Sequence, residues 1–216
     1  MDVLFEDKDI LVINKPTGLQ STTPRFGGPS VIRKARLRSS GAHLVHRLDK
    51  DTSGLMVVGL TSIALSHLNR QFREREVKKI YQALVLQGAS PLPDKIDLPL
   101  APHRLRRPRQ ILAFGRGKPS QTRLLALEQV EVSKGSIYSE IDLSCVRRVM
   151  IELITGTRHQ IRAHLAMVGA PILGCDIYAP KPVERAVNRL MLHAQRLEFE
   201  HPVSKIPLVF EIPAPF

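Results

Sequence analysis

The sequence predicts an α+β fold, in which a mixed, largely antiparallel central sheet carries a few flanking helices. Three observations support this prediction. Short apolar runs with strand-like alternation recur along the chain, and Gly or Pro interrupts most of them. Helical periodicity is confined to a few scattered segments. The 216 residues contain no convincing interdomain linker, so we expect a single domain over residues 1–216.

The charge balance indicates the class of partner. The chain has 32 Lys and Arg against 20 Asp and Glu, a formal net charge of +12 and a pI near 10.2. Such an excess attracts polyanions such as RNA, DNA and anionic membranes. Because the amino end lacks signal-peptide features and no apolar run could span a bilayer, we expect a cytoplasmic protein without a membrane partner.

The first half of the chain opens with two apolar runs around an acidic turn, and Pro and Gly end the second run. Residues 20–43 are rich in Lys and Arg and contain no acid, which predicts a basic loop beside any RNA-binding cleft. The elements expected here are a β-hairpin over 3–13, a turn over 14–18, a short helix near 31–37, a strand over 55–60, a helix over 61–76 and a strand over 78–86.

The second half has a further acid-free stretch over residues 101–127, which predicts a basic hairpin that clamps RNA. Its two strands are expected over 111–114 and 122–127. The remaining expected elements are strands over 137–145 and 149–154, a helix over 157–168 and late strands over 190–192, 197–199 and 208–212.

Residues 46–55 carry the most informative pattern. Asp49 follows a cation and precedes Thr52, Ser53 and Gly54, so it lies where one element ends and a tight turn begins. By itself the pattern fits two roles: a carboxylate that organises the turn or pairs with Arg47, and a carboxylate that faces a cleft.

Other chemistries fit the sequence poorly. It contains no P-loop and no dinucleotide-binding glycine motif. Cys145 and Cys175 have no partner at metal-ligand spacing, and His159 and His164 diverge on the predicted helix, so we expect no metal site.

Residues 46–54 read His-Arg-Leu-Asp, two variable residues and Thr-Ser-Gly, which resembles the signature of the RluA-type pseudouridine synthases. Further segments resemble later motifs of that family in order: 71–81, 153–165, 171–178 and 192–194. The resemblance covers nearly the whole chain. It implies a catalytic domain that isomerises specific uridines in structured RNA and needs no cofactor. The RNA is large-subunit rRNA of the 23S type, a tRNA anticodon stem-loop, or both.

The resemblance also assigns roles to residues. Asp49 is the essential carboxylate, which either attacks as a nucleophile or removes the ribose 2′-proton. Tyr81 corresponds to the tyrosine that stacks on the base, and Arg162 to the salt-bridge partner of the carboxylate. Arg47 holds the flipped nucleotide or fills its place in the stack. The RNA-binding residues expected in all are Arg33, His46, Arg47, Arg106, Arg107, Arg109, Arg158, His159 and Gln160.

The chain departs from the family pattern at two positions. Thr157 occupies the place of a family arginine, and Arg158 follows one residue later; Cys175 stands between the Gly and Asp of a later motif. Because Asp49 comes early, we expect no separate amino-terminal RNA-binding domain. The alternatives are a non-catalytic RNA-binding relative and a glycoside hydrolase, which needs a second acid near Asp49. We expect a monomer.

Overall fold

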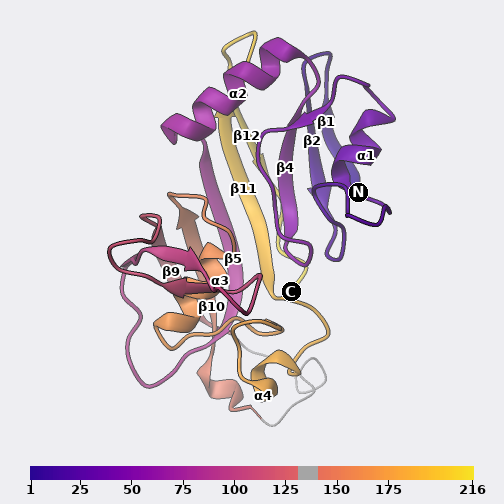
Figure 1. Ribbon diagram of the computed structural model, residues 1–216. Coiled ribbons are helices and arrows are strands. Elements are labelled where there is room, and N and C mark those ends of the chain that lie inside the picture. Colours follow the sequence, from indigo (N-terminus) through magenta and orange to yellow (C-terminus); the bar gives the residue numbers. More distant parts are fainter. Residues whose placement is uncertain (131–140) are drawn as a thin grey trace. The chain divides into compact units, whose positions relative to one another are not determined.

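The computed structural model describes residues 1–130 and 141–216, which divide into two compact units (Figure 1). The first unit is Met1–Lys79 with His193–Pro215, and the second is Ile80–Leu192 with Phe216. Their paired strands and few helices confirm the predicted α+β class. None of the described helices has the length and apolar character needed to cross a membrane.

The first unit contains a mixed sheet and two helices. β1 is antiparallel to β2, and β2 and β3 are antiparallel to β4. β4 runs parallel to the start of β11, which is antiparallel to β12. The elements are β1 (Asp2–Glu6), β2 (Ile10–Lys15), α1 (Val31–Arg36), β3 (His43–Leu44), β4 (Ser53–Gly59), α2 (Ser62–Glu74), β11 (Leu192–Glu200) and β12 (Pro207–Glu211).

The core of this unit lies between α2 and one face of the sheet. The Thr61 side chain caps α2 by accepting the N–H of Ala64, as the sequence predicts. Ala64 and Leu68 then pack on alternate side chains of the strands, in a cluster with Ile10, Val12, Leu55, Val57, Val77, Leu197 and Phe199. This cluster fixes β4, the strand that follows the Asp49 loop.

The junction of β4 with β11 is unusually close. Gly54 has a φ of +115°, and a β-carbon added there would lie 2.3 Å from the carbonyl oxygen of Ala194. Beside it, the Ser53 hydroxyl and His193 Nδ1 are 2.8 Å apart. The glycine after Thr52-Ser53 is therefore required by backbone geometry and by the approach of β11.

The second unit is built on an antiparallel sheet in the order β5-β10-β9-β6, with β7 paired to β8 separately. α3 packs against β8 and β9. The elements are β5 (Lys78–Leu86), whose first two residues belong to the first unit, β6 (Lys95–Asp97), β7 (Leu100–Pro102), β8 (Gln110–Leu112), β9 (Gln121–Gln129), the 3₁₀ helix Leu143–Cys145, β10 (Val146–Leu153), α3 (Gln160–Met167) and α4 (Lys181–Glu184).

The predicted pairing of the basic hairpin was wrong. Residues 110–112 pair with 100–102, not with 121–129. The reason is a tight turn after β8, in which the Ala113 carbonyl accepts the N–H of Gly117 at 2.7 Å and redirects the chain. The arginine-rich hairpin is therefore β7–β8, closed by residues 103–109.

Three further boundaries differ from the predictions. Residues 143–145 form a 3₁₀ helix rather than the end of a strand, and residues 137–140 of that predicted strand lie outside the described part of the chain. α3 begins at Gln160 because His159 adopts the left-handed conformation (φ +53°). The late strands expected over 190–192 and 197–199 are replaced by one continuous strand, β11, which begins at Leu192 and leaves residues 190 and 191 outside it.

Candidate active site

The Asp49 loop of the first unit is held by its neighbours on both sides. Ser21 Oγ donates to the Leu48 carbonyl (2.7 Å) and accepts the Leu48 N–H (3.2 Å). After Asp49, the carbonyls of Lys50 and Asp51 accept bonds from Lys15 and Thr17 at 2.9 and 2.8 Å. The backbone around the partly buried Asp49 is thus fixed by the loop that follows β2.

Lys15 is the residue here whose role the sequence did not reveal. Its side chain is fully buried, and its ammonium group donates to the carbonyls of Pro16, Leu19 and Lys50 at 2.8–2.9 Å. A buried ammonium is tolerable only with such partners. The one available signal was a lysine at the end of an apolar run, directly before a proline.

His46 and Arg47 precede Asp49 and differ in exposure. The His46 ring stacks on Phe72 (centroids 4.6 Å apart), and its Nε2 accepts the N–H of Val57 at 3.0 Å. Burial, with a smaller effect of Lys79, lowers the pKa of His46 to about 3, so its ring is neutral. The ring is thus held within the fold, and its contact with RNA stays a prediction. Arg47 is exposed and has no ion-pair partner among the described residues.

Tyr81 and Arg162 both belong to the second unit. Tyr81 lies on β5 opposite Ile151 and is 6% exposed. Arg162 lies on α3 and is 3% exposed. Its guanidinium donates to Asp176 Oδ1 at 2.5 Å and lies 3.3–3.4 Å from the thiol sulfur of Cys175. The cysteine that departs from the family pattern therefore contacts the predicted catalytic arginine.

The segment around the start of α3 contains both side chains that bond within the protein and an exposed arginine. The buried Gln160 amide makes four hydrogen bonds, to Thr155, Thr157, Gln121 and Thr122, at 2.7–3.0 Å. Its polar atoms therefore face the protein, and its contact with RNA stays a prediction. Arg158 is exposed, whereas the Thr157 hydroxyl lies 2.8 Å from Ser120 Oγ. His159 is buried against Tyr178, with its Nδ1 3.3 Å from the hydroxyl.

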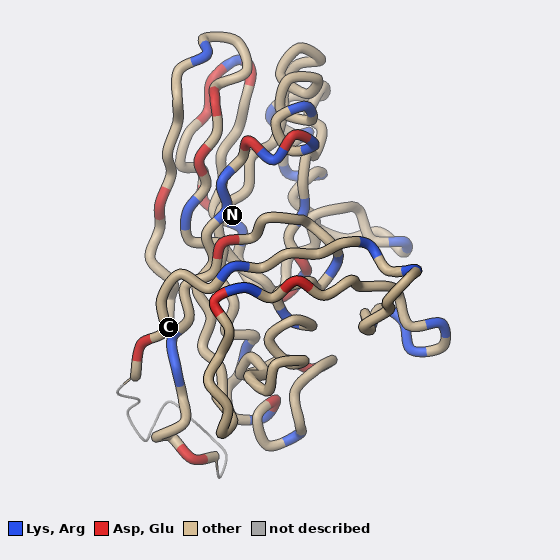
Figure 2. Tube along the Cα trace, turned by 90° about the vertical axis from the view of Figure 1, so that its left-hand side faces the viewer, with Lys and Arg blue, Asp and Glu red and all other residues tan. Residues whose placement is uncertain are grey.

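The β7–β8 hairpin presents cations at its tip. Arg104, Arg106 and Arg107 are exposed, and none has an acidic partner within residues 1–130 and 141–216. His103 Nδ1 accepts the N–H groups of Leu105 and Arg106 at 3.1 and 3.0 Å, which orders the tip. Figure 2 marks basic positions in blue and acidic ones in red, and residues 98–127 contain no acidic position. This hairpin is suited to phosphate contacts.

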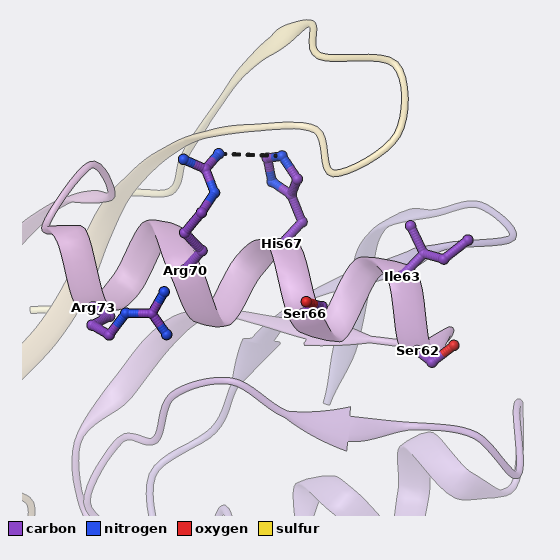
Figure 3. Close-up of a pocket in the computed structure, with 6 residues that line it drawn as sticks. All are labelled: Ser62, Ile63, Ser66, His67, Arg70 and Arg73. Carbon is purple, nitrogen blue, oxygen red and sulfur yellow. Dashed lines mark hydrogen bonds between the residues drawn. The ribbon is translucent and has the colours of Figure 1, made fainter.

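The outer surface of α2 has a different charge pattern. A hollow of about 500 Å³ is lined by Ser62, Ile63, Ser66, His67, Arg70 and Arg73 (Figure 3). Arg70 pairs with Glu74 at 3.0 Å and Arg73 with the same carboxylate at 3.6 Å. Because its arginines are compensated, this surface is a weaker candidate for RNA than the hairpin tip.

Asp7, Asp9 and His201 are the described residues whose arrangement resembles a metal site. However, His201 Nδ1 accepts the N–H groups of Val203 and Ser204, so its Nε2 carries the proton and donates to Asp7 Oδ2 at 2.9 Å. A ligating nitrogen needs a free lone pair. The cluster therefore serves to join the turn after β1 to the turn after β11.

Comparison with known proteins defines the class to which this fold and these residues belong. The family model described as RNA pseudouridylate synthase matches residues 9–167, so the chain belongs to that family and is an enzyme that isomerises uridine in RNA. Within the family it is of the RluA type, as its motifs predicted. It is 40% identical over 218 residues to the Dual-specificity RNA pseudouridine synthase RluA of Yersinia pestis, with 100% of both chains covered. Identity to the protein of that name from Escherichia coli O6:H1 is 40% over 216 residues, covering 99% of this chain and 93% of the relative.

Solved structures agree with the assignment. Human RNA Pseudouridylate Synthase Domain Containing 1 has a TM-score of 0.79 and 27% identity, over 100% of this chain and 84% of the human one. Human RNA Pseudouridylate Synthase Domain Containing 4 has a TM-score of 0.70 and 23% identity, over 99% of this chain and 88% of the human one, and supports the fold alone.

Proposed function

We propose that the two units act as one catalytic domain, residues 1–216, in which Asp49 is the essential carboxylate. In the reaction the bond between uracil N1 and ribose C1′ breaks, the base turns and a bond forms between C5 and C1′; the hydrogen on C5 leaves as a proton, and N1 takes up a proton. Asp49 either attacks the nucleotide or removes the ribose 2′-proton. The observation that supports this role is the loop itself, whose backbone is fixed at Leu48, Lys50 and Asp51 on either side of the carboxylate.

Tyr81 and Arg162 are proposed to complete the chemistry. Tyr81 stacks on the uracil ring and assists loss of the C5 proton, whereas Arg162 stabilises the ionised Asp49 carboxylate. Their burial supports these roles, since a polar side chain is buried in a fold only when a partner or function offsets its lost hydration.

RNA is proposed to be held by exposed cations of both units. The residues are Arg33, Arg47, Arg106, Arg107 and Arg158, with Arg109 at the base of the hairpin. His46, His159 and Gln160 are assigned a supporting role beside them, because the polar atoms given above are used within the protein. Arg47 is proposed to enter the stack that the flipped uridine leaves.

Both rRNA and tRNA are proposed as substrates, because the relatives that match the whole chain are named dual-specificity enzymes. The test is tritium release from [5-³H]uridine in two transcripts, a large-subunit rRNA and a tRNA with its anticodon stem-loop. Release from both supports dual specificity, and release from one alone restricts the substrate to that RNA. An enzyme that binds both transcripts and releases tritium from neither would contradict the proposed substrates.

We further propose a cytoplasmic monomer, since the apolar side chains of the described core are buried within one copy of the chain and RNA of both kinds is present in the cytoplasm. Light scattering in solution should give a mass near 24.2 kDa. A mass of twice that value would contradict the monomer.

A further inference from the structure

Tyr178 has no role in the function proposed above, yet it contacts three separate parts of the second unit. Its hydroxyl accepts the N–H of Gln110, the first residue of β8, at 2.7 Å. The same hydroxyl lies 3.3 Å from Nδ1 of His159, the residue before α3. Burial raises the pKa of Tyr178, so the hydroxyl keeps its proton and can donate it to His159 while accepting from Gln110.

The ring of Tyr178 also lies near two arginines, Arg109 in the segment that closes the hairpin and Arg162 in α3. The Arg109 guanidinium is 5.3 Å from the ring centroid and the Arg162 guanidinium 5.7 Å, both within cation–π range. Arg109 in addition donates to the carbonyl of Ile177 at 2.7 Å. Among the cations of the hairpin, Arg109 is thus the one attached to the segment that holds Arg162.

We propose that Tyr178 is a positioning residue, which links the arginine-rich β7–β8 hairpin to Arg162. The segment 175–178 holds Arg162 through Asp176 and Cys175 and holds the base of the hairpin through Ile177 and Tyr178. RNA bound at the hairpin and the orientation of Arg162 therefore depend on one support. The inference rests on the role proposed for Arg162.

This proposal separates Arg109 from the tip arginines. Loss of Arg106 removes a phosphate contact and should raise the KM for RNA with kcat almost unchanged. Loss of Arg109 removes a contact to the ring beside Arg162 and should lower kcat as well. Arg106→Ala is therefore the matched control for Arg109→Ala on the same hairpin.

The test is kcat and KM by tritium release from a [5-³H]uridine-labelled transcript that the wild type modifies. Tyr178→Phe keeps the ring and its packing but loses both hydroxyl contacts, and we expect kcat about tenfold lower with KM within about twofold. Arg109→Ala should lower kcat by a similar factor, and Arg106→Ala should not. Thermal midpoints of all variants show whether a loss reflects unfolding.

A mutant cycle distinguishes action through Arg162 from a separate defect. If Tyr178 acts through Arg162, Tyr178→Phe should lower kcat far less in an Arg162→Lys background than in the wild type. If Tyr178→Phe lowers kcat by the same factor in both backgrounds, or leaves kcat at the wild-type value, the positioning role of Tyr178 is wrong. The role proposed for Arg162 would not be affected by either result. Wild-type kcat for Arg162→Lys and for Arg162→Ala would instead overturn the role proposed for Arg162.

Discussion

Single buried polar side chains hold the residues around Asp49 in place. The Lys15 ammonium group donates hydrogen bonds to three carbonyls, and a ring nitrogen of His46 accepts the N–H of Val57. Each bond joins loop residues to a strand or to another loop. Buried groups of this kind cost much when a partner is removed, so they define one loop conformation.

The neutral state of His46 gives a prediction for the pH dependence of stability. Its folded pKa of about 3 lies below the ordinary histidine value of 6.5, so only the unfolded chain takes up this proton as the pH falls from about 6.5 to 3. The stabilisation is therefore complete above pH 6.5 and is lost progressively in acid. Relative to His46→Gln, the wild type should lose up to about 2 kcal/mol of unfolding free energy between pH 7 and pH 5. Urea unfolding of both proteins at the two pH values measures this; a difference independent of pH would contradict the buried, neutral ring.

At the scale of elements, the parallel contact of β4 with β11 depends on Gly54. An alanine at this position would have an unfavourable φ of +115°, and its β-carbon would lie 2.3 Å from the carbonyl oxygen of Ala194. The atoms nearest to that β-carbon all belong to the backbone of Ala194, so no flexible side chain can move aside to make room. Gly54→Ala should lower the thermal midpoint by about 6 °C or more, since about 3 kcal/mol is lost in a chain of this size. Gly156→Ala is the control, because nothing lies within 4 Å of its added β-carbon. Equal midpoints for the two variants would show that β11 does not approach Gly54 as described.

Local patterns were sufficient to predict most elements. Thr61 before a helical stripe predicted α2, and two apolar runs around an acidic turn predicted the β1–β2 hairpin. The partner of β8 was not predictable, because three residues carry no register signal and the turn after them decides the pairing. Among site residues, the motif predicted Asp49, whereas it did not show that His46 and Gln160 face inward, since burial depends on long-range packing.

At the scale of the whole molecule, the chain has a net charge of +12, and part of this excess of cations lies at the hairpin tip. Many cations elsewhere have acidic partners, whereas Arg104, Arg106 and Arg107 have none among the described residues. Phosphates are therefore their expected counterions, and each contact releases ions from RNA.

Salt dependence tests this assignment. Replacing the three tip arginines by alanine should reduce the slope of log Kd against log salt concentration by about 2, from about 0.7 per phosphate contact on single-stranded RNA. The matched control is Arg70→Ala with Arg73→Ala, whose cations are compensated on α2 and should leave the slope unchanged. Filter binding of the same transcript from 50 to about 200 mM salt provides the slopes. Equal slopes for the wild type and the tip variant would place the RNA elsewhere.

The role proposed for the Asp49 carboxylate is tested most directly by single-turnover tritium release by Asp49→Asn and Asp51→Asn on a transcript that the wild type modifies. Asparagine keeps the size of the side chain but can neither attack nor accept a proton, so Asp49→Asn should lose activity by at least about 10³-fold while still binding RNA. Asp51→Asn keeps the backbone carbonyl that Thr17 holds and should retain activity within a few-fold. Wild-type release by Asp49→Asn would contradict a role of this carboxylate in the chemistry.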